Sequence, residues 1–476
     1  MINFFKISQL ITVIIAFLLL IVIHLPILTN SVPLIVPELK WMLVGERMGE
    51  GFMMYKQIWS DVSPLSGFVY WLLDLFVGRS QLSYQILALM LVILQGLYFN
   101  HSLQKHQQYP EKSNLPLLLY VLCMGLFFDF FTLSPMLMSI TFLLLALDGL
   151  FSHINDEASN DEVFSIGFYI GVATLFYFPL ALFAAYAFIC FLLLAATNAR
   201  KYFLMLFGFI FTLGLAALFF YMINGLEDLY YNSILRLLEF HKTYYVSFQD
   251  MLLLASPFIA ILALSAFQLF GGDTRFIHYQ IRCQQALFMW AITAGLCLLV
   301  VPSVAPYQLI VFVPVVVFFG THLLLTIRKK ILADLIFMCL LLAVVFINFS
   351  TAFSLFSWVD LNKLVVNETQ NTKITNKKLL VAGDNLEGYL YNKLATPYLE
   401  WSLAERHFNY LEDYVNVVEI YENFRKDMPD VIIDQNGKIA ELFTRIPALA
   451  QYYAKEQNSN VYIRKGQPSS ANRIEN

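Results

Sequence analysis

Long apolar runs recur from about residue 8 to residue 353 and constrain this chain more than any other feature. A bilayer core about 30 Å thick is crossed by roughly 20 helical residues, so a run of that length predicts a membrane-spanning helix. Hydrophobic residues make up 59% of the chain and charged residues 13%, which favours a polytopic membrane protein over a soluble one. The predicted spans, about eleven in number, cover residues 8–29, 82–103, 115–128, 135–151, 164–179, 180–197, 203–223, 251–270, 286–301, 307–327 and 331–353.

Three apolar runs, 115–151, 164–197 and 286–327, are too long for one crossing. Each contains a residue pattern that interrupts a helix, because proline removes a backbone donor and clashes with the preceding turn. We therefore predict three tight helical hairpins with short legs. The interruptions are Asp129 to Pro135, Pro179, and Pro302 to Pro306.

The distribution of basic residues predicts the orientation, since lysine and arginine in short loops stay on the cytoplasmic side. With a cytoplasmic amino terminus, the inner loops carry most of these residues and the outer hairpin turns carry none. The segments 30–80 and 224–250 and the tail from about residue 357 are then predicted to face outward. The inner basic set is Lys6, Lys105, Lys112, Arg200, Lys201, Arg275, Arg282, Arg328, Lys329 and Lys330.

The tail differs from the rest of the chain in its pattern. Short apolar runs end in turn residues, which is typical of buried strands, and they alternate with helical periodicity. We predict a mainly α membrane bundle over 1–356, with a first outer loop at 30–80, and a small soluble α/β extracytoplasmic domain over 357–476. The predicted strands are Lys377 to Asp384, Met428 to Asp434 and Asn460 to Arg464, and helices are predicted over 400–425 and 438–454.

Charge and cysteine content exclude some functions. The net charge is −4 and no long basic block occurs, so nucleic-acid binding is not predicted. The five cysteines form no CxxC pair and lie in or beside apolar runs, so neither a disulfide framework nor a metal site is readable. A requirement for a divalent metal or another cofactor stays open.

The first outer loop carries an unusual cluster of charges and turns for so apolar a chain. A similar pattern of short motifs occurs in a known superfamily. The stretches concerned are Pro37-Glu38, Gly51, Tyr55-Lys56-Gln57, Ser63-Pro64-Leu65, Phe68-Val69-Tyr70-Trp71-Leu72, Val77-Gly78-Arg79-Ser80 and, much later, Ala305-Pro306-Tyr307 through Pro314.

In these motifs and in layout, the chain resembles the GT-C superfamily of polytopic lipid-dependent glycosyltransferases, which includes protein O-mannosyltransferases and aminoarabinose transferases. The layout also resembles an uncharacterised family of Bacteroidota inner-membrane proteins. The resemblance implies a multi-pass protein of the bacterial inner membrane with a periplasmic carboxyl-terminal domain. It also implies a polyprenyl-phosphate-linked sugar donor, used at the outer face of that membrane.

Two acidic residues are candidate catalytic groups. Such a transferase needs a carboxylate that takes a proton from the acceptor, and Glu38 is the candidate. Asp129, at an outer hairpin turn, is a candidate second carboxylate. The alternatives are a Glu38 that interacts with a helix dipole, and an Asp129 that belongs to a capped turn with Thr132 and Ser134.

The leaving phosphate needs cations, and guanidinium matches phosphate geometry best. Tyrosine and other aromatic side chains of the outer face are candidates for stacking on a sugar ring. Interfacial cations also anchor lipid headgroups, aromatic belts occur at every membrane interface, and Arg47 fits a solvated ion-paired helix face with Glu46 and Glu50. The candidates for binding the substrate or its lipid phosphate are Arg47, Lys56, Arg236, His241, Lys242 and Tyr307.

The chain also departs from the superfamily pattern. Pro37 stands at the position of the first acid, Gln57 stands where a second carboxylate is common, and no basic residue precedes Tyr307. These departures favour an alternative function, a non-catalytic membrane scaffold or subunit of an envelope complex that retains the transferase fold and binds protein partners.

Overall fold

The computed structural model falls into two compact units, each assembled from separate stretches of the chain. We call 1–33, 80–219 and 237–363 the helical unit, and 34–79, 220–236 and 364–476 the mixed unit. The structure describes residues 2–5, 9–29, 33–155, 158–195, 198–238, 242–271, 277–353, 355, 358–367, 374–457 and 459–466.

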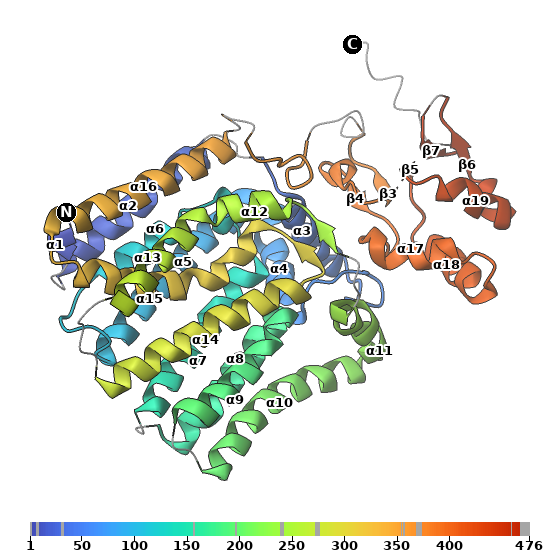
Figure 1. Ribbon diagram of the computed structural model, residues 1–476. Helices are drawn as coiled ribbons and strands as arrows, with labels where there is room; N and C mark the ends of the chain where they lie inside the picture. Colours follow the sequence, from blue (N-terminus) through green and yellow to red (C-terminus); the bar gives the residue numbers. More distant parts are fainter. Residues whose placement is uncertain are drawn as a thin grey trace. The chain divides into compact units, whose positions relative to one another are not determined.

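The helical unit is a bundle of long apolar helices in which α7, α8, α9 and α14 pack together (Figure 1). A two-stranded parallel ladder of β1 (Thr243–Tyr244) and β2 (Ser303–Val304) is its only described sheet. The helices are α1 (Ile2–Phe5), α2 (Leu10–Thr29), α5 (Gln81–Lys105), α6 (Leu115–Met124), η1 (Phe128–Phe131), α7 (Pro135–Ile154), α8 (Asn160–Phe176), η2 (Phe178–Ala181), α9 (Leu182–Leu194), α10 (Ala199–Met222), α12 (Phe248–Leu254), α13 (Ser256–Gly271), α14 (His278–Val300), η5 (Pro306–Phe312), α15 (Val313–Thr326) and α16 (Lys330–Ala352).

A helix lies at each of the eleven predicted spans. Within the described residues, seven helices are long and apolar enough to cross a membrane, or eight if the bent pair α12 and α13 is one span. The difference arises in the predicted hairpins, where α6 has only 10 residues, α8 only 17 and α9 only 13. Proline and short 3₁₀ segments divide these runs, as expected from their interruptions.

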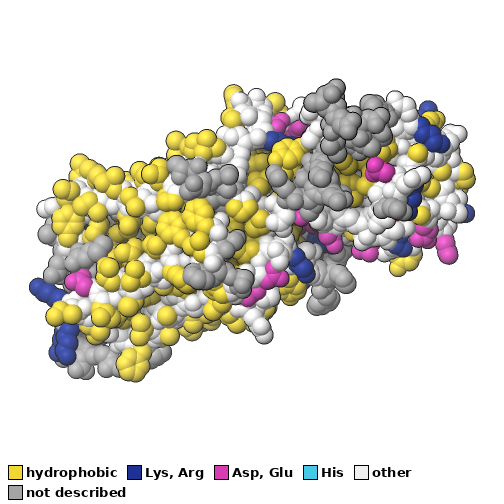
Figure 2. Space-filling model, turned by 90° about the horizontal axis from the view of Figure 1, so that it is seen from above, with side chains coloured by type: hydrophobic (Ala, Val, Ile, Leu, Met, Phe, Trp, Pro, Cys, Tyr) yellow, Lys and Arg dark blue, Asp and Glu magenta, His cyan; other side chains and the backbone are white. Residues whose placement is uncertain are grey.

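Large apolar side chains cover the outside of the helical unit. On α10, Phe203, Phe207 and Ile210 are each at least 60% exposed. Hydrophobic side chains also dominate the face of the helical unit that Figure 2 shows. So extensive an apolar surface is expected for helices that face lipid, in agreement with a polytopic membrane protein.

In the mixed unit, the first loop folds into two packed helices, α3 (Val36–Gly49) and α4 (Pro64–Val77). The two helices approach closely at Gly45, where an added Cβ would lie 2.5 Å from the Tyr70 carbonyl oxygen. The Trp41 and Tyr70 rings stack with centroids 5.8 Å apart. Only glycine therefore fits at position 45 without a backbone shift.

The carboxyl-terminal part of the mixed unit contains a five-stranded sheet in the order β4-β3-β5-β7-β6. Strand β3 is parallel to β4 and β5, whereas β7 is antiparallel to β5 and β6. The strands are β3 (Lys378–Ala382), β4 (Lys393–Leu394), β5 (Val431–Asp434), β6 (Tyr453–Lys455) and β7 (Val461–Arg464). The other elements are α11 (Leu226–Leu229), η3 (Tyr230–Ile234), η4 (Leu235–Leu238), η7 (Glu387–Tyr389), α17 (Trp401–Asn409), α18 (Tyr414–Lys426), α19 (Lys438–Arg445) and α20 (Pro447–Ala450).

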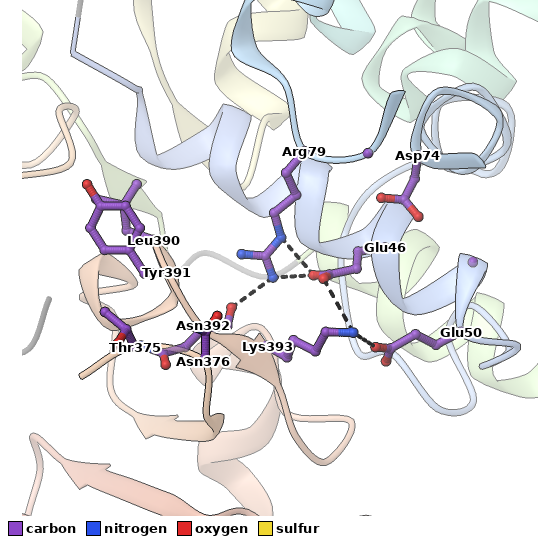
Figure 3. Close-up of a pocket in the computed structure, with 12 residues that line it drawn as sticks. Glu46, Glu50, Asp74, Arg79, Thr375, Asn376, Leu390, Tyr391, Asn392 and Lys393 are labelled. Carbon is purple, nitrogen blue, oxygen red and sulfur yellow. Dashed lines mark hydrogen bonds and ion pairs between the residues drawn. The ribbon is translucent and has the colours of Figure 1, made fainter. Parts of the chain in front are cut away.

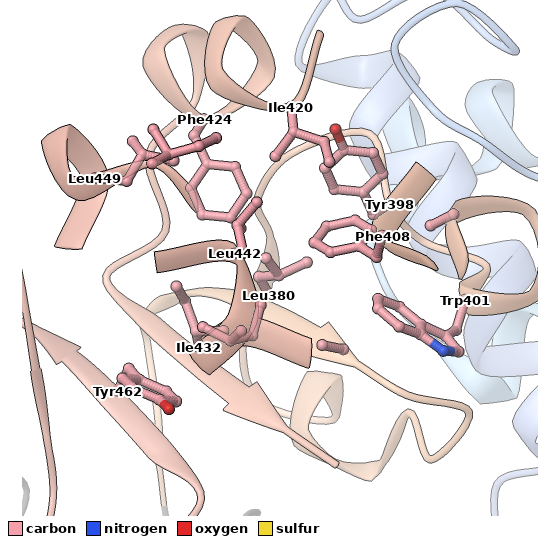
Figure 4. Packing of buried hydrophobic residues seen from close by; sticks show 14 of the residues in the cluster. Leu380, Tyr398, Trp401, Phe408, Ile420, Phe424, Ile432, Leu442, Leu449 and Tyr462 are labelled. Carbon is pink, nitrogen blue, oxygen red and sulfur yellow. The ribbon is translucent and has the colours of Figure 1, made fainter. Parts of the chain in front are cut away.

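One apolar core joins this sheet to its helices (Figure 4). Leu380 and Ile432 of the central strands contact Phe408 of α17 and Phe424 of α18 within a cluster of buried side chains. The three predicted strands are thereby confirmed as the core of an α/β fold. In β3 and β5 the short apolar run that predicted each strand is buried.

Two details of the predicted tail are wrong. The helix predicted over 400–425 is two helices, because the Asp413 side chain accepts a hydrogen bond from the Val415 amide and starts α18 anew. The helix predicted over 438–454 ends early. Tyr453 instead pairs with Arg464 in an edge strand.

Candidate functional site

Two cations and two carboxylates form a buried cluster in the mixed unit. The Lys40 ammonium lies 2.5 Å from an Asp61 carboxylate oxygen and 3.1 Å from Glu400 Oε2. The Arg236 guanidinium lies 3.7 Å from Glu400 Oε1 and donates a hydrogen bond to Ser402 Oγ. All four charged side chains are at most 13% exposed, so the cluster is shielded from bulk water.

Helix α3 and a set of backbone hydrogen bonds position three side chains of this charged cluster, Lys40, Asp61 and Glu400. Helix α3 starts with Pro37 in its first turn and carries Lys40 one turn on. The chain beyond α3 pairs with the start of α17, because the Trp59 amide donates to the Pro397 carbonyl at 2.8 Å and the Glu400 amide donates to the Trp59 carbonyl at 3.3 Å. The Asp61 amide in turn donates to Glu400 Oε2 at 3.0 Å. The carboxylates of residues 61 and 400 are thus held side by side.

The two carboxyl groups differ in their affinity for a proton. Burial would raise the pKa of Asp61, but the adjacent Lys40 ammonium and the Arg236 guanidinium outweigh it and hold that pKa below its ordinary value. Burial, and then the negative charge of Asp61, raise the pKa of Glu400 above its ordinary value. Glu400 is therefore the member of the cluster that gains a proton first. Pairs of groups with pKa values pushed apart are typical of acid–base sites.

The predicted base Glu38 lies in the first turn of α3, two residues before Lys40, and its side chain is 2% exposed. Arg236, a predicted ligand of the lipid phosphate, lies in the charged cluster. Helix α3 therefore carries both a candidate base and a cation of the cluster.

Arg47 is not part of this cluster, and the solvated helix face predicted for it is wrong. Its guanidinium donates to Asp427 at 2.6 Å and to Glu50 at 3.0 Å. It also lies 3.7 Å from the centroid of the Phe52 ring. The side chain is 1% exposed, so Arg47 is an internal tie to the segment before β5.

In the helical unit, the structure brings Asp129 and Tyr307 together. The Tyr307 backbone amide donates to Asp129 Oδ2 at 2.9 Å, so the carboxylate in η1 satisfies an amide at the start of η5. Both residues are buried. Two hairpin turns far apart in sequence are thereby joined by a carboxylate.

The remaining predicted cations lie elsewhere. Lys56 is exposed on the loop between α3 and α4. Lys242 is partly exposed and donates to the Leu299 carbonyl of α14. His241 lies outside the described residues. Within the described part of the chain, no group of three or more His, Cys, Asp or Glu side chains is placed to hold a metal ion.

The fold is that of a polytopic helical membrane protein with a small α/β region near its carboxyl terminus. Among solved structures it is similar to ArnT from Cupriavidus metallidurans bound to undecaprenyl phosphate, with a TM-score of 0.55 and 11% identity over 95% of this chain and 97% of that chain. The apo state of the same ArnT gives a TM-score of 0.53 and 11% identity over 94% and 97% of the two chains. No family model matches the chain, and no curated protein matches its sequence.

Sequence reasoning selected Arg236 but did not select its partners Lys40, Asp61 and Glu400 as site residues. Lys40 and Asp61 stand out only as members of the charged first loop. Glu400 lies 360 residues beyond Lys40, and no spacing connects them. Its one local signal is an acid directly before Trp401, at the start of a helix.

Proposed function

We propose that this protein is a glycosyltransferase of the bacterial inner membrane that takes a polyprenyl-phosphate-linked sugar as donor at the outer face. The observation that carries the proposal is similarity over nearly the whole chain to a protein solved with undecaprenyl phosphate. The amino terminus is then cytoplasmic and the carboxyl-terminal α/β domain periplasmic, as the basic residues of the loops predict.

The charged cluster supplies the groups that this chemistry requires. In the reaction, the bond from the sugar anomeric carbon to the phosphate oxygen breaks, a bond to the acceptor oxygen forms, and the acceptor proton passes to a carboxylate. Arg236 and Lys40 would stabilise the departing lipid phosphate. When no lipid-linked sugar donor is bound, Asp61 and Glu400 neutralise these two cations. A bound phosphate would compete for them.

Glu38 is proposed as the base and Asp129 as a second carboxylate of the reaction. Glu38 is buried in the first turn of α3, the helix that also carries Lys40 of the charged cluster. Lys242 and Tyr307 remain secondary candidates for contacts with the donor. For Arg47, the contacts with Asp427 and Glu50 favour a structural role instead.

Measuring how tightly the detergent-purified protein binds undecaprenyl phosphate tests the role of Arg236 in binding the lipid phosphate. Arg236→Gln should weaken binding by about 10- to 100-fold, because a charge-assisted hydrogen bond contributes roughly 1.5–3 kcal/mol. Arg236→Lys keeps the charge and serves as a fold control, and Arg425→Gln removes an exposed arginine from α18 of the same unit. Equal affinities for the wild type, Arg236→Gln and Arg425→Gln would remove Arg236 from the donor site.

Glu38→Gln tests the base separately. It should bind undecaprenyl phosphate like the wild type and lose sugar transfer, because the amide accepts no proton. Unchanged transfer would exclude Glu38 as the base.

The alternative is a non-catalytic subunit of an envelope complex. Pro37, in the first turn of α3 where the superfamily has its first acid, favours it. Purified protein that carries no lipid phosphate, and binds none when undecaprenyl phosphate is added, would support this alternative over the transferase.

A further inference from the structure

A polar pocket that is separate from the charged cluster opens in the mixed unit (Figure 3). It has a volume of about 780 Å³, within the range of small-molecule sites. Three stretches of chain line it: the last turns of α3, the end of α4 with Arg79, and residues 375–393.

Arg79 holds the walls of this pocket together. Its Nε donates to Glu46 Oε2 at 2.7 Å. Its guanidinium also donates to the carbonyl oxygens of Tyr389, at 2.9 Å, and Asn392, at 2.8 Å. Lys393 adds a second tie, 2.7 Å from Glu50. Ion pairs and hydrogen bonds therefore connect the walls of the pocket, and both of its cations are engaged in ion pairs.

Asp74 is the exception among the charged groups of the pocket. No cation and no hydrogen-bond donor of the described residues contacts its carboxylate, and no dashed contact reaches it in Figure 3. Gly49 leaves room for this group, since an added Cβ would lie 2.6 Å from Asp74 Oδ2. Burial, and then the negative charge of Glu46, raise the pKa of Asp74 above its ordinary value. A charged group without a partner is a frequent feature of binding sites.

The rim of the pocket adds an aromatic ring and amides. The Tyr391 side chain is 49% exposed. Asn376 adopts a left-handed conformation with φ of 54° and donates its amide to the Tyr391 carbonyl at 3.0 Å. Figure 3 shows the Tyr391 ring and the Asp74 carboxylate on opposite sides of this pocket. An aromatic face and a carboxylate acceptor in one pocket suit a sugar, whose C–H face packs on an aromatic ring while its hydroxyls donate to carboxylates.

The charge of the pocket selects among ligands. Glu46, Glu50 and Asp74 outnumber Arg79 and Lys393 by three to two, and both cations are already paired. An anionic group would meet an excess of negative charge, whereas hydroxyl or ammonium donors would meet a carboxylate acceptor. We propose that this pocket binds a neutral or amino sugar and that Asp74 and Tyr391 are its recognition residues.

If this sugar is the acceptor of the transferase, that role rests on the proposed function. The proposal that the pocket binds a sugar does not rest on it. Binding and transfer therefore need separate measurements. Arg236→Gln should weaken donor binding by about 10- to 100-fold and leave sugar binding in the pocket unchanged. Loss of transfer without loss of sugar binding would count against the proposed function alone.

The test is saturation-transfer NMR on the detergent-purified full chain with methyl mannoside, glucosamine and glucose 6-phosphate as probes. Methyl mannoside and glucosamine should bind, and glucose 6-phosphate should bind at least tenfold more weakly. Asp74→Asn and Tyr391→Ala should each weaken binding of the two uncharged or cationic probes at least tenfold. Glu422→Gln, which removes an exposed acid of α18, should leave it unchanged.

Asp74→Asn is expected to fold at least as well as the wild type, since it removes a repelled carboxylate. A loss of binding in this variant therefore reports recognition. Wild-type affinity in Asp74→Asn, tighter binding of glucose 6-phosphate than of glucosamine, or no binding of any probe would each overturn the proposal.

Discussion

The buried charged cluster predicts a large stability cost for Lys40→Met. The ammonium lies 2.5 Å from Asp61 and 3.1 Å from Glu400. At an effective dielectric constant of about 20, each pair attracts by roughly 5–7 kcal/mol before the cost of desolvation. Removing the lysine leaves two carboxylates and one guanidinium in a buried site. Loss of one partner from such a network costs about 3–5 kcal/mol.

Hydrogen exchange measured by mass spectrometry is a suitable assay, because it reports the opening free energy of one region in a protein with several units. Peptides that cover residues 59–63 and α17 should open more easily by that amount in Lys40→Met. The double variant Lys40→Met with Asp61→Asn restores neutrality and should recover roughly 2 kcal/mol or more.

Lys426→Met is the matched control, since its ammonium lies 3.7 Å from Glu422 on an exposed face of α18. An exposed pair of this spacing contributes only about 0.3–0.5 kcal/mol. If Lys40→Met cost no more than Lys426→Met, or if Asp61→Asn failed to compensate it, the cluster would not be the internal neutral network described above.

Two further predictions concern the mixed unit. Phe408→Ala removes a fully buried ring from the core and should destabilise the unit by about 3–5 kcal/mol, measured by hydrogen exchange in α17 and β3; a cost under about 1 kcal/mol would contradict the packing of this core. Burial would raise the pKa of Asp427, but the adjacent Lys378 and Arg47 outweigh burial and lower that pKa. Ionised Asp427 therefore stabilises the unit above about pH 4, and this stabilisation is lost as the pH falls through the lowered pKa of the folded state. Exchange measured between pH 6 and pH 3 should show this loss in the wild type and a smaller one in Asp427→Asn; identical pH profiles would refute it.

The sequence predicts the membrane helices well because hydropathy is a local property. Each of the eleven apolar segments is helical, and the hairpin interruptions at Asp129 and Pro179 fall in 3₁₀ turns between helices. The strands β3 and β5 are also visible locally, as apolar runs that end in a turn.

Two kinds of feature escape such reasoning. The edge strand at Tyr453 lies in a helical pattern, and only its pairing with Arg464 selects the extended conformation. The contact of Lys40 with Glu400 depends on how the chain folds over hundreds of residues, so no periodicity encodes it. Helical spacing places Glu46, Arg47 and Glu50 near one another, but it does not indicate that Arg47 is buried against Asp427.

The mixed unit is composed of stretches that the ribosome makes at very different times. Residues 34–79 emerge early, and their partners from 364 onward follow only after the whole membrane bundle has been synthesised. Lys40 and Asp61 are therefore made together, whereas their partner Glu400 lies 360 positions beyond Lys40. Contacts of such long sequence separation form slowly, so this region completes its folding only after the residues from 364 onward have been synthesised.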